Sequence, residues 1–381
     1  MRVAGAWLEA PETQAVCRIL TDAGYQALFV GGCVRNALLD APVGDIDVAT
    51  DALPERVIEL AGAAGLKPVP TGIDHGTITV VSGGIPHEVT TFREDVETFG
   101  RHAVVAFSTD IRADARRRDF TMNALYAQPD GKVLDPLNGL SDLRARRVRF
   151  IEQAEERIQE DYLRILRFFR FHAWYGDPEG GLDADGLAAC AANLDGLPSL
   201  SRERTGTEMR KLLAAPDPAP AVSAMQATGV LNVVLPGAQA GGLAPLVHLE
   251  SGTDTAADPI LRLAVIGGEG AAERLRLSKA DQKRLVKLRD AAVGDMQAGE
   301  LGYRFSTEEG RAILLLRAVL SDSPLNASTF EALNAGAAAR FPIKAADLMP
   351  DYSGEALGAR LRTLERRWIE SGFLLTREDL L

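Results

Sequence analysis

The sequence predicts an α+β protein in which a small mixed α/β domain precedes an all-helical remainder. Short runs of β-branched and apolar residues, separated by glycines, occur before about residue 140. Long amphipathic stretches take over from residue 141. The 381 residues suffice for two or three domains with cores of their own. We therefore divide the chain into a head (1–140), a helical neck (141–215) and a helical body and tail (216–381).

The elements expected in the head follow from local patterns. The run 26–32 is apolar and ends in two glycines, which indicates a buried strand followed by a sharp turn. Residues 45–50 alternate polar and apolar side chains like a half-buried strand. Two β-branched runs, 77–82 and 87–92, flank a Gly-Gly turn and predict two more strands. One helix is expected before these strands, over 12–23, and two between them, over 33–40 and 54–65.

Helical periodicity dominates the rest of the chain. Amphipathic helices are expected over 153–175, 202–214, 270–290 and 308–321. Stretches rich in Gly, Pro or Ala predict loops at 175–181, 214–221 and 236–242.

Composition excludes several classes of protein. With 46% hydrophobic and 25% charged residues the chain is neither disordered nor, lacking a run of about 18 apolar residues, membrane-spanning. Its three cysteines, Cys17, Cys33 and Cys190, are far apart and lack CxxC spacing, which argues against a disulfide framework and a zinc knuckle. The first residues lack the apolar core of a signal peptide. We expect a cytoplasmic protein.

The charge is unevenly spread along the chain. The net charge is -11, yet residues 111–170 carry 13 basic and 10 acidic side chains. An acidic protein lacks the broad positive field that indiscriminate nucleic-acid binding needs, but a local arginine track can still hold phosphates.

A pair of glycines predicts a phosphate-binding turn. Gly31 and Gly32 stand between the first strand and a helix, where backbone N–H groups can approach a phosphate and Arg35 follows one turn later. Neither GxGxxG nor GK[ST] is present, so the turn is not a dinucleotide or Walker loop.

Paired carboxylates follow this turn. Asp45 and Asp47, two residues apart on an expected strand, point to the same face and can bridge divalent cations. Glu88, on the expected strand 87–92, has the parity to add a third carboxylate, as two-metal phosphoryl-transfer sites often require. The alternatives are a turn followed by an N-capping aspartate and, for Glu88, a solvent-facing strand residue.

A basic turn lies at the end of the head. Arg116, Arg117 and Arg118 are followed by Asp119 and, four residues on, Asn123. Arginine forks onto phosphate oxygens, while Asp and Asn suit a ribose hydroxyl. A plain basic surface turn remains the alternative.

The neck carries a polar helix face with Asp161, Arg164, Arg167 and Arg170. Asp161 and Arg164 are i,i+3 neighbours if the helix is continuous. A carboxylate only accepts and a guanidinium only donates hydrogen bonds. Cytosine and adenine present an amine beside a ring-nitrogen acceptor, whereas uracil and guanine reverse that order, so this pair would accept C and A and reject U and G. The alternative is a salt-bridged, solvated helix face.

Nine segments in this order resemble the class II tRNA nucleotidyltransferases, the CCA-adding enzymes, and their poly(A) polymerase relatives. They are GGCVRNALL, GDIDVAT, HGTITV, EVTTFRED, GRHAVVAF, RRDFTMNAL, LDPLNGLSDL, RIQEDYLRILRFFRF and LSRERTGTEMRKLL. The resemblance covers roughly residues 26–235. The chain departs from the pattern at Asn36, where the family usually has Asp, and this affects a local turn contact alone.

The resemblance implies a polymerase-β-type nucleotidyltransferase head followed by helical neck, body and tail. Asp45 and Asp47 would hold two Mg²⁺ ions, and Gly32 and Arg35 would contact the triphosphate. Phosphate and ribose would be bound by Arg118 with Asp119, the incoming base by Asp161 with Arg164, and the triphosphate also by Arg167 and Arg170.

The activity implied is addition of CCA to the 3′ end of tRNA from CTP and ATP, with no membrane and no protein partner. The rivals are a poly(A) polymerase, an enzyme adding only A or only CC, and a non-catalytic RNA-binding protein on the same fold. Residues 95–105 resemble the flexible loop of full CCA-adding members, which favours the complete activity. Phosphate contacts to tRNA are expected from two clusters on the helical half, Arg202, Arg204, Arg210 and Lys211, and Lys279, Lys283, Arg284 and Lys287.

Overall fold

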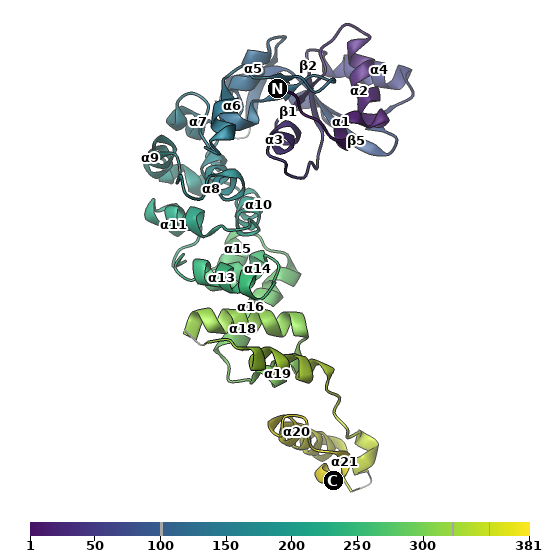
Figure 1. The fold of residues 1–381 in the computed structure, drawn as a ribbon, viewed down its shortest axis with the longest axis vertical. Helices are drawn as coiled ribbons and strands as arrows, with labels where there is room; N and C mark the ends of the chain where they lie inside the picture. Colours follow the sequence, from purple (N-terminus) through teal and green to yellow (C-terminus); the bar gives the residue numbers. More distant parts are fainter. Residues whose placement is uncertain (100–101, 322–323, 350) are drawn as a thin grey trace. The chain divides into compact units, whose positions relative to one another are not determined.

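The chain forms two compact units, Met1–Val234 and Leu235–Leu381 (Figure 1). The computed structural model describes residues 1–99, 102–321, 324–349 and 351–381. The first unit contains the strands of the described chain and the helices that follow them, and the second is helical. The predicted class, a small mixed sheet followed by many helices, is confirmed.

The first unit is built on a seven-stranded sheet with the order β3-β4-β5-β2-β1-β8-β9. Its strands are β1 (Leu28–Val30), β2 (Asp47–Thr50), β3 (Lys67–Gly72), β4 (Thr77–Ser82), β5 (Ile85–Thr91), β8 (Tyr126–Ala127) and β9 (Val133–Leu134). Neighbours pair antiparallel except β2 and β5, which run parallel. A separate hairpin of β6 (Arg93–Phe99) and β7 (His102–Phe107) follows β5.

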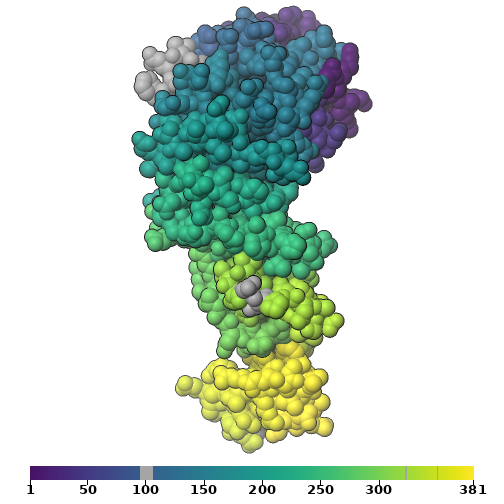
Figure 2. Space-filling view, turned by 60° about the vertical axis from the view of Figure 1, so that its left-hand side comes forward, coloured from purple at the N-terminus to yellow at the C-terminus, as the bar shows by residue number. Residues whose placement is uncertain are grey.

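Helices cover this sheet. Helices α2 (Pro11–Thr21) and α4 (Pro54–Ala63) lie side by side against β3, β4 and β5 (Figure 1). The other helical elements among these strands are α1 (Ala6–Glu9), α3 (Gly32–Leu38), η1 (Ile73–His75), α5 (Ile111–Arg116) and η2 (Thr121–Asn123). In a space-filling view, the purple N-terminal residues and the blue residues that follow them lie against one another (Figure 2).

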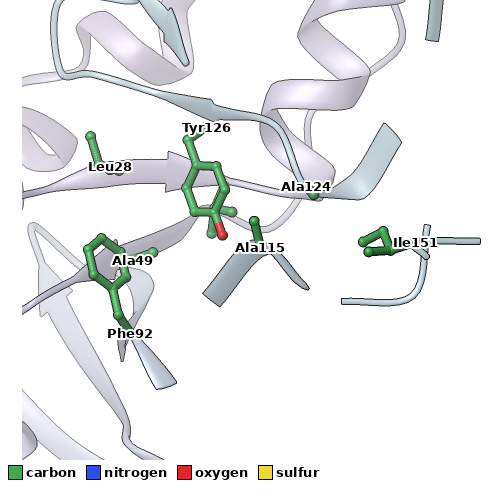
Figure 3. Close-up of a cluster of buried hydrophobic side chains, with 8 residues drawn as sticks. Leu28, Ala49, Phe92, Ala115, Ala124, Tyr126 and Ile151 are labelled. Atoms are coloured by element: carbon green, nitrogen blue, oxygen red, sulfur yellow. The ribbon is translucent and has the colours of Figure 1, made fainter. Parts of the chain in front are cut away.

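A buried cluster joins the sheet to α5. Leu28 and Val30 of β1, Ala49 of β2 and Tyr126 of β8 pack with Ala115, and further members are Phe92, Ala124 and Ile151 (Figure 3). Each of these side chains is 3% exposed or less. This core fixes β1, β2 and α5, which carry the turn, a carboxylate and the basic segment of the predicted site.

The first unit continues in helices. They are α6 (Gly139–Arg144), α7 (Ala154–Glu160), α8 (Leu163–Tyr175), α9 (Ala184–Ala192), η3 (Leu194–Ser199), α10 (Arg202–Leu213), α11 (Ala219–Ala227) and α12 (Val230–Val234). Helix α8 packs against α10 and α11, and its Phe168 and Phe169 are fully buried.

Two of the predicted helices are wrong as continuous elements. Residues 153–175 form α7 and α8, because Asp161 adopts an extended conformation with φ -154° and ψ 103°. Residues 270–290 form α15 (Ala271–Arg274) and α16 (Lys279–Val293), since Ser278 caps the second helix by accepting a hydrogen bond from the Asp281 backbone N–H. The predicted strand 45–50 begins at Asp47, which leaves Asp45 outside it.

The second unit is assembled from short helices. Besides α15 and α16 they are α13 (Leu243–Gly252), α14 (Pro259–Ile266), α17 (Ala298–Arg304), α18 (Thr307–Ser321), α19 (Ala327–Ala338), η4 (Ala345–Leu348), α20 (Gly354–Glu370) and α21 (Arg377–Leu380). Ile343, Leu348, Leu364, Trp368 and Leu380 form a small core towards its C-terminal end. Within the described residues, none of the helices has both the length and the apolar character that crossing a membrane requires.

Candidate active site

The predicted glycine turn lies where β1 ends and α3 begins. Gly31 adopts φ 69° and ψ -119°, a conformation that other residues rarely take, and its N–H donates to the Leu125 carbonyl at 3.2 Å. A Cβ at Gly31 would lie 3.6 Å from Nη1 of Arg118 and 3.8 Å from the Asn123 carbonyl oxygen. The turn therefore lies directly beside the basic segment.

The predicted carboxylates come together at the edge of the glycine turn. Asp47 is the first residue of β2, and Asp45 lies exposed just before it. Glu88 of β5 is the residue opposite Asp47 in the parallel pair, and its N–H donates to the Ile46 carbonyl at 3.1 Å. Neighbouring residues in register project to the same face of a sheet, so Glu88 lies beside Asp47.

The carboxylates of Asp45, Asp47 and Glu88 carry more negative charge than the neighbouring guanidinium of Arg118 can neutralise. Burial, and then the charges of Glu88 and Asp45, raise the pKa of Asp47 to about 6, while Arg118 acts in the opposite direction. Carboxylates that repel one another beside a single guanidinium favour the binding of a cation.

The donor atoms fit a hard divalent cation. All three side chains offer oxygen, which Mg²⁺ prefers. Across the described residues, no three His, Cys, Asp or Glu side chains are close enough to enclose a metal. A site made of Asp45 and Asp47 would thus leave most coordination positions to water and phosphate oxygens, as Mg²⁺ sites in nucleotide enzymes do.

The three consecutive arginines have different surroundings. Arg116 is mostly exposed and pairs with Glu152 at 3.4 Å. Arg117 and Arg118 both pair with Asp114, at 2.8 and 3.0 Å, and are largely covered. Of the three, Arg118 is therefore the one that the structure holds against the glycine turn.

A buried hydrogen-bonded chain connects the turn to the helices. Arg35, 6% exposed, donates through Nη1 to the Asn123 side-chain oxygen at 2.6 Å. Asn123 donates in turn to Asp119 at 2.9 Å, and Asp119 accepts from Nε of Arg167 at 2.8 Å. Four predicted nucleotide-binding residues thus form one network. Burial by itself raises the pKa of Asp119, but Arg167 and the hydrogen bonds lower it to about 2.

Two residues that the sequence did not identify complete this network. Tyr175 at the end of α8 accepts a hydrogen bond from Nη2 of Arg35 at 2.9 Å, and the guanidinium lies 4.0 Å from its ring centre. Glu208 of α10 is 5% exposed and pairs with Arg170 at 2.5 Å. Glu208 lies in the segment LSRERTGTEMRKLL, but the sequence alone does not assign it a partner.

The expected i,i+3 neighbourhood of Asp161 and Arg164 on one helix is wrong. Asp161 lies between α7 and α8, where its side chain accepts from the Leu163 N–H at 3.1 Å and pairs with Arg204 at 2.6 Å. Arg164 instead pairs with Glu160 at 2.5 Å and donates to the Arg117 carbonyl at 3.1 Å. The two side chains therefore have separate partners in this state.

The departure at Asn36 is accommodated locally. Its side-chain oxygen accepts from Nε and Nη2 of Arg35 at 3.1 and 2.8 Å, and its amide donates to the Pro42 carbonyl at 2.8 Å. Asparagine thus still supports the arginine that follows the glycine turn.

The two predicted tRNA-binding clusters contain arginines with acidic partners. Arg204 pairs with Asp161, as described, and Arg284 pairs with Asp258 and Glu309 at 2.5 and 3.0 Å. Lys287 also pairs with Glu309, at 2.7 Å. Exposed side chains in these clusters are Arg202, Lys211, Lys279, Lys283 and Lys287. The predicted loop 95–105 includes residues 100 and 101, which lie outside the described residues.

Comparisons with known proteins identify similar families and relatives. Residues 27–149 match the family described as poly A polymerase head domain, and residues 182–241 match the probable RNA and SrmB-binding site of polymerase A. The human mitochondrial CCA tRNA nucleotidyltransferase 1 is 40% identical over 215 residues, which are 54% of this chain and 50% of that protein. The CCA-adding enzyme of Streptococcus pyogenes (serotype M5, strain Manfredo) is 42% identical over 219 residues, 56% of this chain and 53% of that protein. The matched stretch thus spans about half the length of these relatives.

A solved structure is similar over nearly the whole chain. The crystal structure of the Bacillus stearothermophilus CCA-adding enzyme in complex with CTP aligns with 94% of this chain and 92% of its own. The TM-score is 0.71 and the identity 26%. The Thermotoga maritima CCA-adding enzyme complexed with tRNA aligns with a TM-score of 0.71 at 16% identity, over all of this chain and 97% of its own, and this likeness concerns the fold alone.

Proposed function

We propose that the chain is a member of the tRNA nucleotidyltransferase and poly(A) polymerase family and that it adds CCA to the 3′ end of tRNA from CTP and ATP. The observation that carries the proposal is the placement of Asp47, Asp45 and Glu88 beside the Gly31 turn and Arg118. This arrangement offers cation ligands next to phosphate-binding groups, as nucleotidyl transfer requires.

The reaction is attack by the RNA 3′-hydroxyl on the α-phosphate, with pyrophosphate leaving. Asp45 and Asp47 would hold Mg²⁺, and the bound ion would supply a lower pKa for the attacking hydroxyl and positive charge beside the leaving oxygens. Arg118 donates to the triphosphate beside Gly31 and Gly32, and Glu88 is placed to assist the carboxylate pair. The protein's own contribution is positioning and charge stabilisation.

The buried network positions the sugar and the phosphates. Asp119 and Asn123 are close to the turn and suit a ribose hydroxyl, while Arg35 and Arg167 fix both side chains from either side. Arg170, held by Glu208, extends the positive surface of α8. A nucleotide bound here would meet groups that are already oriented, which lowers the entropic cost of reaction.

Base selection is assigned to Asp161 and Arg164. Each has another partner in this structure, Arg204 for Asp161 and Glu160 for Arg164. Both bonds are replaceable, because both pairs are only partly buried. The proposal therefore includes an exchange, in which the pairing edge of C or A replaces Arg204 and Glu160 as the partner of this pair.

The closest rivals are separated by substrate. A poly(A) polymerase adds A to RNA without the preceding C, and a partial enzyme stops after CC or adds the terminal A alone. The protein is incubated with tRNA lacking its last three nucleotides and each labelled nucleotide in turn, alone and in pairs. We expect two CMP and then one AMP, and no incorporation of UMP or GMP. Incorporation of AMP alone on this substrate would refute CCA addition.

Binding of tRNA is assigned to shape and phosphate contacts through the helical half. Exposed Arg202, Lys211, Lys279 and Lys283 supply candidate contacts, and the affinity should fall between 50 and 200 mM salt because condensed counterions are released. A salt-independent affinity would contradict docking led by phosphates. The free thiols of Cys17, Cys33 and Cys190 are consistent with the proposed cytoplasmic location.

A further inference from the structure

Asp114 is a buried carboxylate beside the site to which no role has been assigned. It lies on α5, four residues before Arg118, the arginine beside the glycine turn, and its side chain is 1% exposed. A fully buried carboxylate is costly unless it is paired and hydrogen-bonded, so its partners determine what it does.

Both oxygens of Asp114 are used. Oδ1 accepts from Nε of Arg117 at 2.8 Å. Oδ2 accepts from Nη2 of Arg118 at 3.0 Å and from the Tyr126 hydroxyl at 2.6 Å. Burial by itself would raise the pKa of Asp114, but Arg118, Arg117 and Tyr126 hold it well below its usual range, so the group is an anion at neutral pH.

Tyr126 closes a ring of contacts around Arg118. Its hydroxyl accepts from Nε of Arg118 at 3.3 Å while it donates to Asp114. The Tyr126 ring belongs to the core cluster, and its hydroxyl oxygen is turned towards Ala115 of α5, the residue after Asp114 (Figure 3). The hydrogen-bonded group of Arg118, Asp114 and Tyr126 is therefore anchored both to strand β8 and to helix α5.

These contacts leave one edge of the Arg118 guanidinium for a ligand. Nε and Nη2 are held by Tyr126 and Asp114, and Nη1 is the atom that lies beside Gly31. Arg118 also acts electrostatically on Asp47. An arginine without its buried partner would be drawn towards these acidic side chains and away from an incoming phosphate.

We propose that Asp114 is a positioning residue that holds Arg118 with Nη1 towards the glycine turn, where the nucleotide triphosphate binds. The inference rests on the proposed function in one respect, the identity of the ligand as CTP or ATP. Asp114 itself touches neither the ligand nor the reacting atoms. Its effect is exerted through Arg118, with Tyr126 as a second support.

The test is a double-mutant cycle between Asp114→Asn and Arg118→Ala, read out as KM for CTP and for ATP and as equilibrium binding of each nucleotide. In the wild-type background, Asp114→Asn should raise KM for both nucleotides by the same factor, about tenfold, because a charge-assisted hydrogen bond to the guanidinium is lost. In the Arg118→Ala background the same change should have no further effect on KM. Tyr126→Phe should raise KM by a smaller factor.

Asp110→Ala is the matched control. Asp110 caps the same helix by accepting from the Arg112 N–H at 2.8 Å and contacts none of the arginines of the site. It should lower the melting temperature and leave KM unchanged. If Asp114 served stability alone, Asp114→Asn would behave like Asp110→Ala, or its effect would add to that of Arg118→Ala, and either result would overturn the proposal.

The experiment distinguishes failure of this inference from failure of the proposed function. If the wild-type protein incorporates neither CMP nor AMP, the proposed function fails, and binding of CTP and ATP to the same four proteins still decides the role of Asp114. If Asp114→Asn does not fold, the cycle is carried out with Tyr126→Phe. A Tyr126→Phe effect that persists in full without Arg118 would then overturn the proposal.

Discussion

Replacing Asp119 by Asn tests whether the buried network stabilises the first unit. Asp119 accepts hydrogen bonds from the Phe120 N–H, from Asn123 and from Arg167 at 2.8 to 2.9 Å. Its pKa is lowered from 3.8 to about 2, which corresponds to about 2 kcal/mol in favour of the charged form in the folded state. We expect the Asp119→Asn protein to be less stable than the parent by about that amount at pH 7.

The sign of the pH dependence follows from the lowered pKa. A carboxyl group whose pKa is lower in the folded state stabilises the protein above its ordinary pKa, and this contribution is lost as the pH falls towards the lowered value. The difference between the two proteins should therefore be complete above about pH 5 and shrink as the pH falls from 3.8 towards about 2.

The measurement is urea unfolding at several pH values, followed by tryptophan fluorescence. Parent and variant both carry Trp368→Phe, so that the signal comes from Trp7 and Trp174 of the first unit. Asp130→Asn is the control, because Asp130 is an exposed surface carboxylate and its removal should change little. A difference below about 0.5 kcal/mol, or one that does not change with pH, would refute the assigned role.

Three further changes test other parts of the molecule. Asp47→Asn should lower the rate of pyrophosphate release by about 100-fold or more for CTP and ATP alike, and retention of more than about a tenth of the rate would contradict its role as metal ligand. Asp161→Ala should reduce the preference for CTP over UTP in competition kinetics by about 5- to 150-fold, whereas Arg204→Ala, which removes the other partner of Asp161, should preserve it. Unchanged selectivity in Asp161→Ala would reject base selection by this residue. Arg262→Met should destabilise the second unit by about 3–5 kcal/mol, since it removes the guanidinium that pairs with buried Glu250 at 2.7 Å. Further replacement of Glu250 by Leu should recover most of this loss in urea unfolding, and a failure to recover would show that the loss has another cause.

The fold class and much of the head could be predicted because local patterns and tertiary structure agree there. The run 77–82 forms β4 as expected, and the Gly31–Gly32 turn lies between a strand and a helix. Strands β3, β8 and β9 carry weak patterns, since two of them are only two residues long and Lys67–Gly72 contains two prolines. Their pairing depends on the rest of the sheet, which a local pattern does not contain.

The interruption at Asp161 had a sequence signal that helical periodicity obscured. Apolar residues continue at helical spacing on both sides of Asp161, so the pattern predicts a single helix. Aspartate, however, favours the position just before a helix, where its side chain accepts from a backbone N–H, and Asp161 does so here towards Leu163. The same holds for Ser278 before α16.

Which of the candidate site residues lie close together was easier to predict than the contacts that they make. The two-residue period of a strand predicted which face of the sheet Glu88 occupies, and in the structure Glu88 lies opposite Asp47. The sequence could not indicate that β5, the strand of Glu88, pairs with β2. The partner of a long side chain such as Arg164 depends on which carboxylate the fold brings within reach, and Glu160 is nearer than Asp161. Asp114 was missed because a carboxylate three and four residues before two arginines is common on exposed helices.

The parallel pairing of β2 with β5 has a consequence for how the protein folds. Asp47 and Glu88 are separated by forty residues in the chain and become neighbours only when the β3-β4-β5 meander docks on β2. This contact closes a long loop, and it brings like charges together, so both chain entropy and electrostatics oppose it. Burial of the adjoining Val48 and Val89 supplies the driving force, and Arg118 offsets part of the repulsion. The carboxylates of the candidate site are thus brought together by the least local pairing around β2, and we expect a refolding chain to form its β3-β4-β5 meander before this site.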